Sequence, residues 1–191
     1  MKMTESTENQ NLNDILRLLK AGKSVLSVGH PENYLTIIPD ILKAIIPQAE
    51  EGSPRAIIIC TNDDQAKMLH ELTSKAVKQQ DLTVDLIFEK GNKLKQRNDL
   101  FDGTEIIIGT PKRICELYFQ NGFNIGKLKI FMILQMDEQM RLGHKGYISR
   151  VGESLPKCRQ LMFTLNPDEE RTADYIDKFV SPVTMYDFEL E

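Results

Sequence analysis

The sequence predicts an α/β fold, a three-layer α/β/α sandwich built on a mostly parallel sheet. Short β-branched runs alternate with longer helical stretches along nearly the whole chain, as in folds where helices connect parallel strands. The runs Ala56–Ile59 and Ile106–Ile108 are apolar without alternation, which is typical of parallel strands covered on both faces. The chain has 191 residues, 41% of them apolar, which is enough to bury one core in one domain.

Strands and helices are predicted in alternating order by these patterns. The predicted strands are Ser24–Val28, Arg55–Cys60, Thr83–Phe88, Glu105–Gly109, Leu128–Leu134, Gln160–Thr164 and Val183–Asp187. The predicted helices are Leu12–Lys20, Tyr34–Ile46, Asp63–Lys78, Lys93–Phe101, Pro111–Phe119, Gly146–Leu155 and Pro167–Phe179. No internal repeat and no linker long enough to divide two domains interrupts this order.

The beginning of the chain lacks such a pattern. Residues 1–11 are polar and are predicted to form a flexible N-terminal segment, whereas residues 12–191 form the single domain. Leu12, Ile15 and Leu19 have the spacing of an amphipathic helix, so the first helix is predicted to begin at Leu12.

Charge and cysteine content narrow the classes of function. The 24 Lys and Arg residues against 28 Asp and Glu give a net charge of −4, which excludes a protein that coats nucleic acid by bulk positive charge. No apolar run could span a membrane and no signal peptide opens the chain, so no membrane contact is expected. Cys60, Cys115 and Cys158 lie far apart, which predicts neither a disulfide framework nor a zinc site, and favours a reduced, cytoplasmic compartment.

The segment after the strand that ends at Gly109 is the most informative for function. Ligands of parallel α/β sheets bind outside the carboxyl ends of the strands. Thr110 can cap the next helix and Pro111 suits its first position. Free N–H groups at that helix start, with Lys112 and Arg113 beside them, would form an anion site. The alternative is a well-capped helix whose basic residues are simply solvated.

Two further segments carry charged residues in patterns that could bind a phosphate backbone or a metal ion. Residues 90–97 hold four basic residues and no acidic one, so they either follow a phosphate backbone or form a solvated helix start. Asp137 and Glu138 come directly after a buried strand, an arrangement that serves Mg²⁺ and an attacking water in phosphoryl transfer. An Asp-Glu pair of this kind is also common in solvated loops.

In order and spacing, these segments resemble the first RecA-like domain of the DEAD-box and related superfamily 2 helicases. The resemblance covers roughly residues 21–183 and implies a RecA-like domain of the P-loop NTPase type. Residues 109–114 look like the TPGR motif with Lys112 in place of its glycine, and Lys90-Gly91 occupies the double-glycine position. Asp137-Glu138-Gln139-Met140 falls where the D-E-A-D tetrapeptide belongs, and residues 155–166 are similar to the family's LPxxRQxLLFSAT stretch.

The departures from the family pattern concern ATP. The family's AxTGxGKT loop should follow the first strand, but residues 29–39 lack its lysine and its glycine pattern, and Glu32 adds a negative charge. A phosphate loop works through backbone N–H groups that glycine conformations expose, together with a lysine. Met140 also replaces the last Asp of the tetrapeptide, and Leu165-Asn166 alters the SAT motif. The resemblance therefore implies a degenerate domain for which neither ATP and Mg²⁺ nor another metal is expected as a cofactor.

Three functions stay open on the sequence, and enzymatic activity is the least favoured of them. The chain ends without the second helicase domain, so an autonomous helicase is not expected. The first hypothesis is weak, ATP-independent binding of RNA or another single-stranded nucleic acid, for which the resemblance implies six residues: Lys90, Gly91, Thr110, Pro111, Lys112 and Arg113. The second is a protein-interaction or regulatory module, favoured by the net negative charge and the acidic end at Asp187, Glu189 and Glu191. The third is a cryptic nucleotide hydrolase that uses Asp137 and Glu138.

Overall fold

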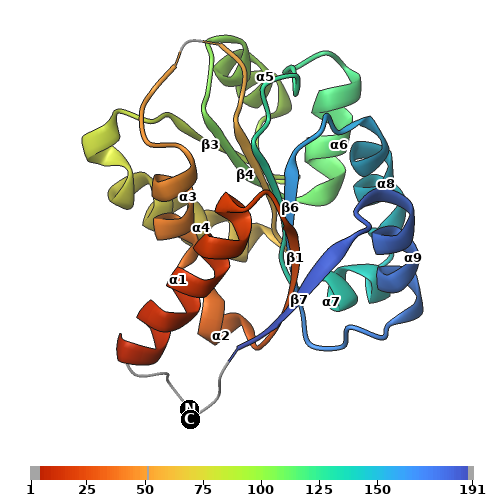
Figure 1. Ribbon diagram of the computed structural model, residues 1–191. Coiled ribbons are helices and arrows are strands. Elements are labelled where there is room, and N and C mark those ends of the chain that lie inside the picture. The colour runs from red at the N-terminus through yellow and green to blue at the C-terminus, as the bar shows by residue number, and fades with distance from the viewer. Residues whose placement is uncertain (1–4, 51, 189–191) are drawn as a thin grey trace.

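The computed structural model describes residues 5–50 and 52–188, and these form a seven-stranded sheet with helices on both faces (Figure 1). The strands are β1 (Ser24–Val28), β2 (Ala56–Ile59), β3 (Val84–Ile87), β4 (Ile106–Gly109), β5 (Ile130–Ile133), β6 (Arg159–Thr164) and β7 (Val183–Asp187). Their order in the sheet is β3-β4-β2-β5-β6-β1-β7, and every pairing is parallel. The predicted three-layer α/β/α sandwich is thus confirmed.

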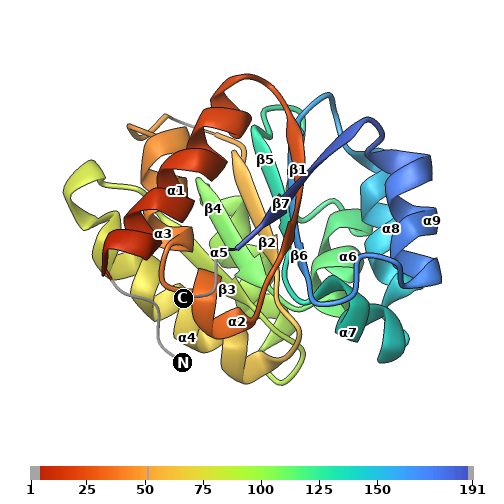
Figure 2. The same cartoon turned by 60° about the horizontal axis from the view of Figure 1, so that its bottom comes forward.

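The helices divide between the two faces of the sheet (Figures 1 and 2). One face is covered by α1 (Glu5–Lys20), α2 (Pro31–Tyr34), α3 (Ile38–Ile45) and α4 (Asp63–Ala76), which is followed by the 3₁₀ turn η1 (Lys78–Gln80). The other face is covered by α5 (Lys93–Phe101), α6 (Pro111–Phe119), α7 (Met136–Arg141), α8 (Lys145–Ser154) and α9 (Glu170–Phe179). None of the helices in the described ranges is long and apolar enough to cross a membrane.

The central strands are buried on both faces, as their unbroken apolar runs predict. Ile58 packs into the core beneath α1, α3 and α4, whereas its neighbours Ile57 and Ile59 pack into the core beneath α6 to α9. Successive side chains of a strand point to opposite faces, so each apolar run in β2, β4 and β5 supplies both cores. This burial fixes the sheet, and with it the positions of the loops at its two edges.

Helix α1 begins earlier than the sequence predicts. Residues 5–11, expected to belong to a flexible segment, form its first turns, while residues 1–4 lie outside the described part. Thr7 and Asn11 are buried together with Ile15 and Leu19, at steps of four residues along one helix face. The buried stripe therefore continues through polar residues, which is why the apolar pattern gave no sign of it.

The helix predicted over residues 34–46 begins later, as α3 at Ile38, and the separate short helix α2 precedes it. Pro31 starts the first of these helices, and Pro39 lies in the first turn of the second. Proline lacks the N–H group that a continuous helix would need, but it fits the first turn, where that group has no partner in any case. A new helix therefore begins just before Pro39.

Candidate functional site

The loops that follow the strands meet at the carboxyl edge of the sheet, where the candidate residues were expected. Figure 2 shows α2, which follows β1, and α7, which follows β5, at this edge. A cavity of about 240 Å³ lies there, between the ends of β1, β2, β5 and β6. Its lining includes Gly29, Tyr34, Gln135, Asp137 and Thr164.

An aromatic side chain, that of Tyr34, packs in the turn that follows β1. Tyr34 is fully buried and stacks on Phe163 of β6, with 4.1 Å between the ring centroids. Phe188 packs against the same turn, where a Cβ atom added at Gly29 would lie 2.8 Å from its ring. Burial raises the pKa of the Tyr34 phenol, so this group stays neutral at physiological pH. The turn is thus held by apolar packing around a short helix of four residues.

Asp137 and Glu138 lie in the first turn of α7, and each has its own partners. Asp137 Oδ2 accepts hydrogen bonds from the backbone N–H groups of Leu165, at 3.2 Å, and Asn166, at 2.9 Å. Glu138 accepts two hydrogen bonds from the Arg141 guanidinium, at 2.8 and 2.5 Å, and this pairing lowers the pKa of Glu138. Within residues 5–50 and 52–188, no group of three or more His, Cys, Asp or Glu side chains could hold a metal ion.

A glutamine network links the ends of β2 and β5, and sequence reasoning missed it. Gln135 Oε1 accepts hydrogen bonds from Thr61 Oγ1, at 3.0 Å, and from Gln65 Nε2, at 2.7 Å. Gln65 Oε1 in turn accepts from the Thr61 backbone N–H at 2.8 Å. Gln135 has a left-handed backbone conformation (φ 45°), which turns the chain sharply between β5 and α7. The polar groups at the middle of this edge are therefore engaged with one another.

The structure corrects the expected exposure of Arg113. Its side chain is buried, with 8% of the residue accessible, and its guanidinium donates hydrogen bonds to Glu89 O (2.7 Å), Gly91 O (3.1 Å) and Gln96 Oε1 (3.0 Å). These bonds tie the loop after β3 to the start of α6. Arg113 is therefore a residue that positions this loop, and its donors are not open to a phosphate.

Thr110 and Pro111 are buried as well. Thr110 is at the N-cap position of α6, but its hydroxyl makes no capping hydrogen bond, so the predicted cap is absent. The reason is that its side chain faces the interior, where Oγ1 has no partner among the described residues. The expected contact of these two side chains with a phosphate backbone does not fit this burial.

Three of the six expected nucleic-acid-binding residues, Lys90, Gly91 and Lys112, do reach the surface. Lys90 is exposed and Gly91 is half-buried. Lys112 is 44% exposed at its side chain, and its Nζ lies 3.7 Å from Oε2 of Glu89, which places it beside the loop that carries Lys90. A Cβ atom at Gly91 would collide with the Gln96 amide, so the glycine allows close packing of this loop on α5. Arg113 thus brings the double-glycine and TPGR positions onto one surface.

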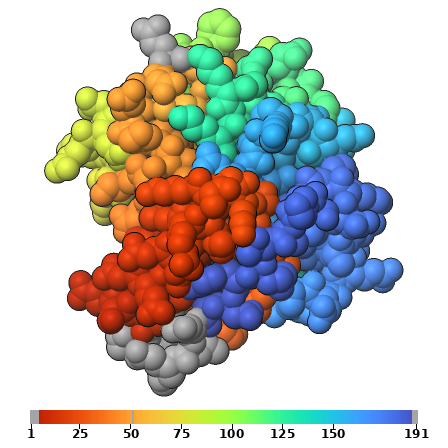
Figure 3. Space-filling view, in the orientation of Figure 1, coloured from red at the N-terminus to blue at the C-terminus, as the bar shows by residue number. Residues whose placement is uncertain are grey.

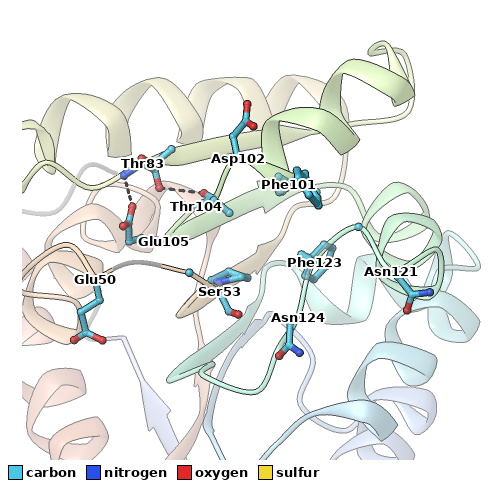
Figure 4. Close-up of a pocket in the computed structure, with 15 residues that line it drawn as sticks. Glu50, Ser53, Thr83, Phe101, Asp102, Thr104, Glu105, Asn121, Phe123 and Asn124 are labelled. Carbon is cyan, nitrogen blue, oxygen red and sulfur yellow. Dashed lines mark hydrogen bonds between the residues drawn. The ribbon is translucent and has the colours of Figure 1, made fainter.

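The opposite, amino edge of the sheet carries a second hollow, of about 760 Å³ (Figure 4). Phe101 and Phe123 lie across from one another in it, and Thr83, Thr104 and Glu105 are joined by hydrogen bonds. Glu105 Oε2 accepts from the Thr83 N–H at 2.6 Å, and Glu50 forms an ion pair with Arg55 at 3.3 Å. None of the candidate site residues predicted from the sequence lines this hollow.

No family model matches the chain, but individual proteins do. The ATP-dependent RNA helicase eIF4A of Eremothecium gossypii is 22% identical over 129 residues, which are 68% of this chain and 33% of that protein. The pre-mRNA-processing ATP-dependent RNA helicase PRP5 of Saccharomyces cerevisiae is 26% identical over 159 residues, 82% of this chain and 17% of that protein. The chain is a distant homologue of DEAD-box RNA helicases. It spans a third or less of the length of these two relatives.

Solved structures agree on the fold. A DEAD-box protein from Methanococcus jannaschii superposes with a TM-score of 0.83 at 17% identity, over 94% of this chain and 49% of that one. Dbp5 of S. cerevisiae, solved with nup159 and gle1, has a TM-score of 0.71 at 16% identity, over 97% of this chain and 52% of that one. The chain therefore has the fold of the N-terminal RecA-like domain of DEAD-box helicases and spans about half the length of each matched structure.

Proposed function

We propose that the chain is a RecA-like domain that binds single-stranded nucleic acid, RNA above all, weakly and without ATP. One observation carries this proposal: the turn after β1 is packed by the chain's own aromatic side chains and lacks a lysine, whereas Lys90 and Lys112, from two strand-contacting motifs, stay accessible, with Lys112 beside the loop that carries Lys90. The enzymes that the chain resembles need both places, and here only the second keeps its basic residues.

The absence of ATP binding is supported by the packing at the carboxyl edge. Tyr34 and Phe188 occupy the turn after β1, and no lysine follows that strand before α3. Asp137 is engaged by two backbone N–H groups and Glu138 by Arg141. Without a bound triphosphate, two carboxylates hold Mg²⁺ only weakly, because Mg²⁺ loses its water reluctantly.

Mg-ATP is therefore expected to leave the melting temperature unchanged. A ligand at a hundredfold its dissociation constant would add about 2.7 kcal/mol to the free energy of unfolding, which a thermal melt detects easily. If millimolar Mg-ATP raises the melting temperature by several degrees, and Asp137→Ala abolishes the rise, the cryptic-hydrolase hypothesis replaces this one.

Nucleic-acid binding is expected to depend on Lys90 and Lys112. We expect Lys90→Glu/Lys112→Glu to weaken the binding of a fluorescent oligouridylate. The loss should be similar for single strands of other sequences, because lysine contacts with phosphates read no bases. Each lost contact should flatten the slope of log affinity against log salt by about 0.7. Fluorescence anisotropy at two salt concentrations measures both effects.

Lys43→Glu/Lys78→Glu is the matched control for this titration. It changes the net charge by the same amount at lysines that line neither the carboxyl-edge cavity nor the surface around Lys90. An unchanged affinity in the Lys90/Lys112 variant, or an equal loss in the control, would contradict the proposed surface.

A protein-interaction module is the second candidate, and exposed apolar residues on α5 favour it. Leu94 is 66% exposed and Phe101 is 87% exposed, and their spacing of seven residues places both on one side of the helix. If wild-type protein binds no single strand at low salt, this side of α5 is where a protein partner should be sought.

A further inference from the structure

A basic hollow of about 960 Å³ lies at the amino edge of the sheet, away from the surface of Lys90 and Lys112. We call it the amino-edge groove and define it by its five cations, which come from the end of α1, the loop before β1 and the starts of β5 and β6. They are Lys20, Lys23, Lys129, Lys157 and Arg159. No acidic side chain contributes to its lining.

The strand order brings these distant positions together. The strands β5, β6, β1 and β7 are neighbours, and residues at or just before their starts form the floor of the groove. In the space-filling view, the red segment near the N-terminus lies beside the blue segment near the C-terminus, and within these segments β1 pairs with β7 from Ser24 and Val183 onward (Figure 3). Hydrogen bonds fix the floor, because Arg159 N donates to Lys129 O at 3.3 Å and Gln160 N donates to Ser24 Oγ at 3.0 Å.

Arg159 links the end of α1 to the start of β6 at this groove. Its Nη1 donates to Leu19 O at 2.8 Å, so the guanidinium adds a second hydrogen bond to a C-terminal carbonyl of α1 that also accepts from the Gly22 N–H at 3.0 Å. This bond fixes the end of α1, and with it Lys20, next to β6. Arg159 and the end of the helix that carries Lys20 are thus held in place before any ligand arrives.

The four lysines of the groove have no ion-pair partner in the part of the chain that the structure describes. By contrast, most lysines elsewhere on the described surface lie within ion-pair distance of an acid, among them Lys43, Lys75, Lys95 and Lys145. A lysine in the last turn of a helix offsets the helix dipole, but that accounts for Lys20 alone. Such a concentration of unpaired positive charge in a chain of net charge −4 calls for an anionic ligand.

We propose that the amino-edge groove binds the phosphate backbone of single-stranded nucleic acid, at a site separate from the surface of Lys90 and Lys112. Lysine ammonium groups suit phosphates as point charges, whereas the planar arginine fork that suits carboxylates is already engaged here by Leu19 O. The groove is open, so a flexible strand can lie along it. Its lining contains no aromatic ring on which a base could stack, so binding is independent of base sequence.

The test is a titration of fluorescent oligouridylate at about 0.05 and about 0.2 M salt. Its variants are Lys23→Glu/Lys157→Glu for the groove, Lys90→Glu/Lys112→Glu for the carboxyl edge, and Lys43→Glu/Lys78→Glu as the charge-matched control. The groove variant is expected to lose about tenfold in affinity at the lower salt and to flatten the salt slope by about 1.4. Lys23 and Lys157 are exposed, and a thermal melt checks that the variant folds; Lys23→Gln/Lys157→Gln replaces it if it does not.

The outcomes separate this proposal from the proposed function. A loss in the groove variant with none in the carboxyl-edge variant supports the groove and contradicts the surface of Lys90 and Lys112. A groove variant that binds as the control does overturns the groove, whatever the carboxyl-edge variant does. If an oligoglutamate peptide binds the wild type more tightly than oligouridylate, and loses that affinity in the groove variant, the groove is a site for acidic proteins and the proposal is wrong.

Discussion

Tyr34→Ala is expected to lower the free energy of unfolding by about 3–5 kcal/mol, the range found when a buried aromatic side chain is truncated. The ring is fully buried, and it stacks on Phe163 and lies 6.1 Å from the ring of Phe188. Its loss would leave a cavity between β1, β6 and the end of β7. Urea unfolding, followed by circular dichroism, measures the change.

Tyr34→Phe is the matched control, since it keeps the stacked ring and removes only the hydroxyl. It is expected to lower the free energy of unfolding by less than about 1.5 kcal/mol. If Tyr34→Ala lowers the free energy of unfolding no more than Tyr34→Phe does, the ring does not pack tightly in the turn after β1, and the packing argument against a phosphate loop there is contradicted.

Arg113→Ala is expected to lower the free energy of unfolding by about 2–4 kcal/mol, although Arg113 lies at a position where the resemblance implies a nucleic-acid contact. Truncation removes three hydrogen bonds and leaves Gln96 and the carbonyls of Glu89 and Gly91 without their charged donor. Lys112→Ala, one position away and half-exposed, is expected to stay within about 0.5 kcal/mol of wild type.

Amide hydrogen exchange gives a second measurement for Arg113→Ala. We expect faster exchange in the loop at residues 89–92, because the guanidinium ties this loop to α6. If Arg113→Ala is as stable as Lys112→Ala and weakens nucleic-acid binding more strongly, Arg113 contacts the strand directly and the positioning role is wrong.

The strands and most helices could be predicted because their signals are local. The unbroken apolar runs mark β2, β4 and β5, and the predicted range of β7 matches the observed one. The first half of α1 could not be predicted, because its buried stripe runs through Thr7 and Asn11. Burial of a polar residue depends on a distant partner, as in the hydrogen bond of the Tyr186 hydroxyl to Asn11 at 2.6 Å.

The sites were harder to predict than the fold. Motif matches predicted that the candidate residues lie at the carboxyl edge of the sheet. The burial of Arg113 could not be predicted, because it follows from hydrogen bonds to carbonyls more than twenty residues away, which leave no trace in residue types. The glutamine network around Gln135 depends on the same kind of long-range contact. The amino-edge groove forms because β5, β6, β1 and β7 are adjacent in the sheet. Local sequence patterns do not predict strand order, so the groove could not be predicted.

The most direct test of ATP-independent binding is a titration of wild-type protein with fluorescent oligouridylate at low salt, with and without millimolar Mg-ATP. We expect a dissociation constant on the order of 10⁻⁴–10⁻⁶ M, typical of non-specific binding, and the same value in both conditions. Linkage requires that a nucleotide coupled to strand binding would change this affinity, and that the strand would change the affinity for nucleotide equally. A dissociation constant that shifts with Mg-ATP, or no binding at all, would contradict the account.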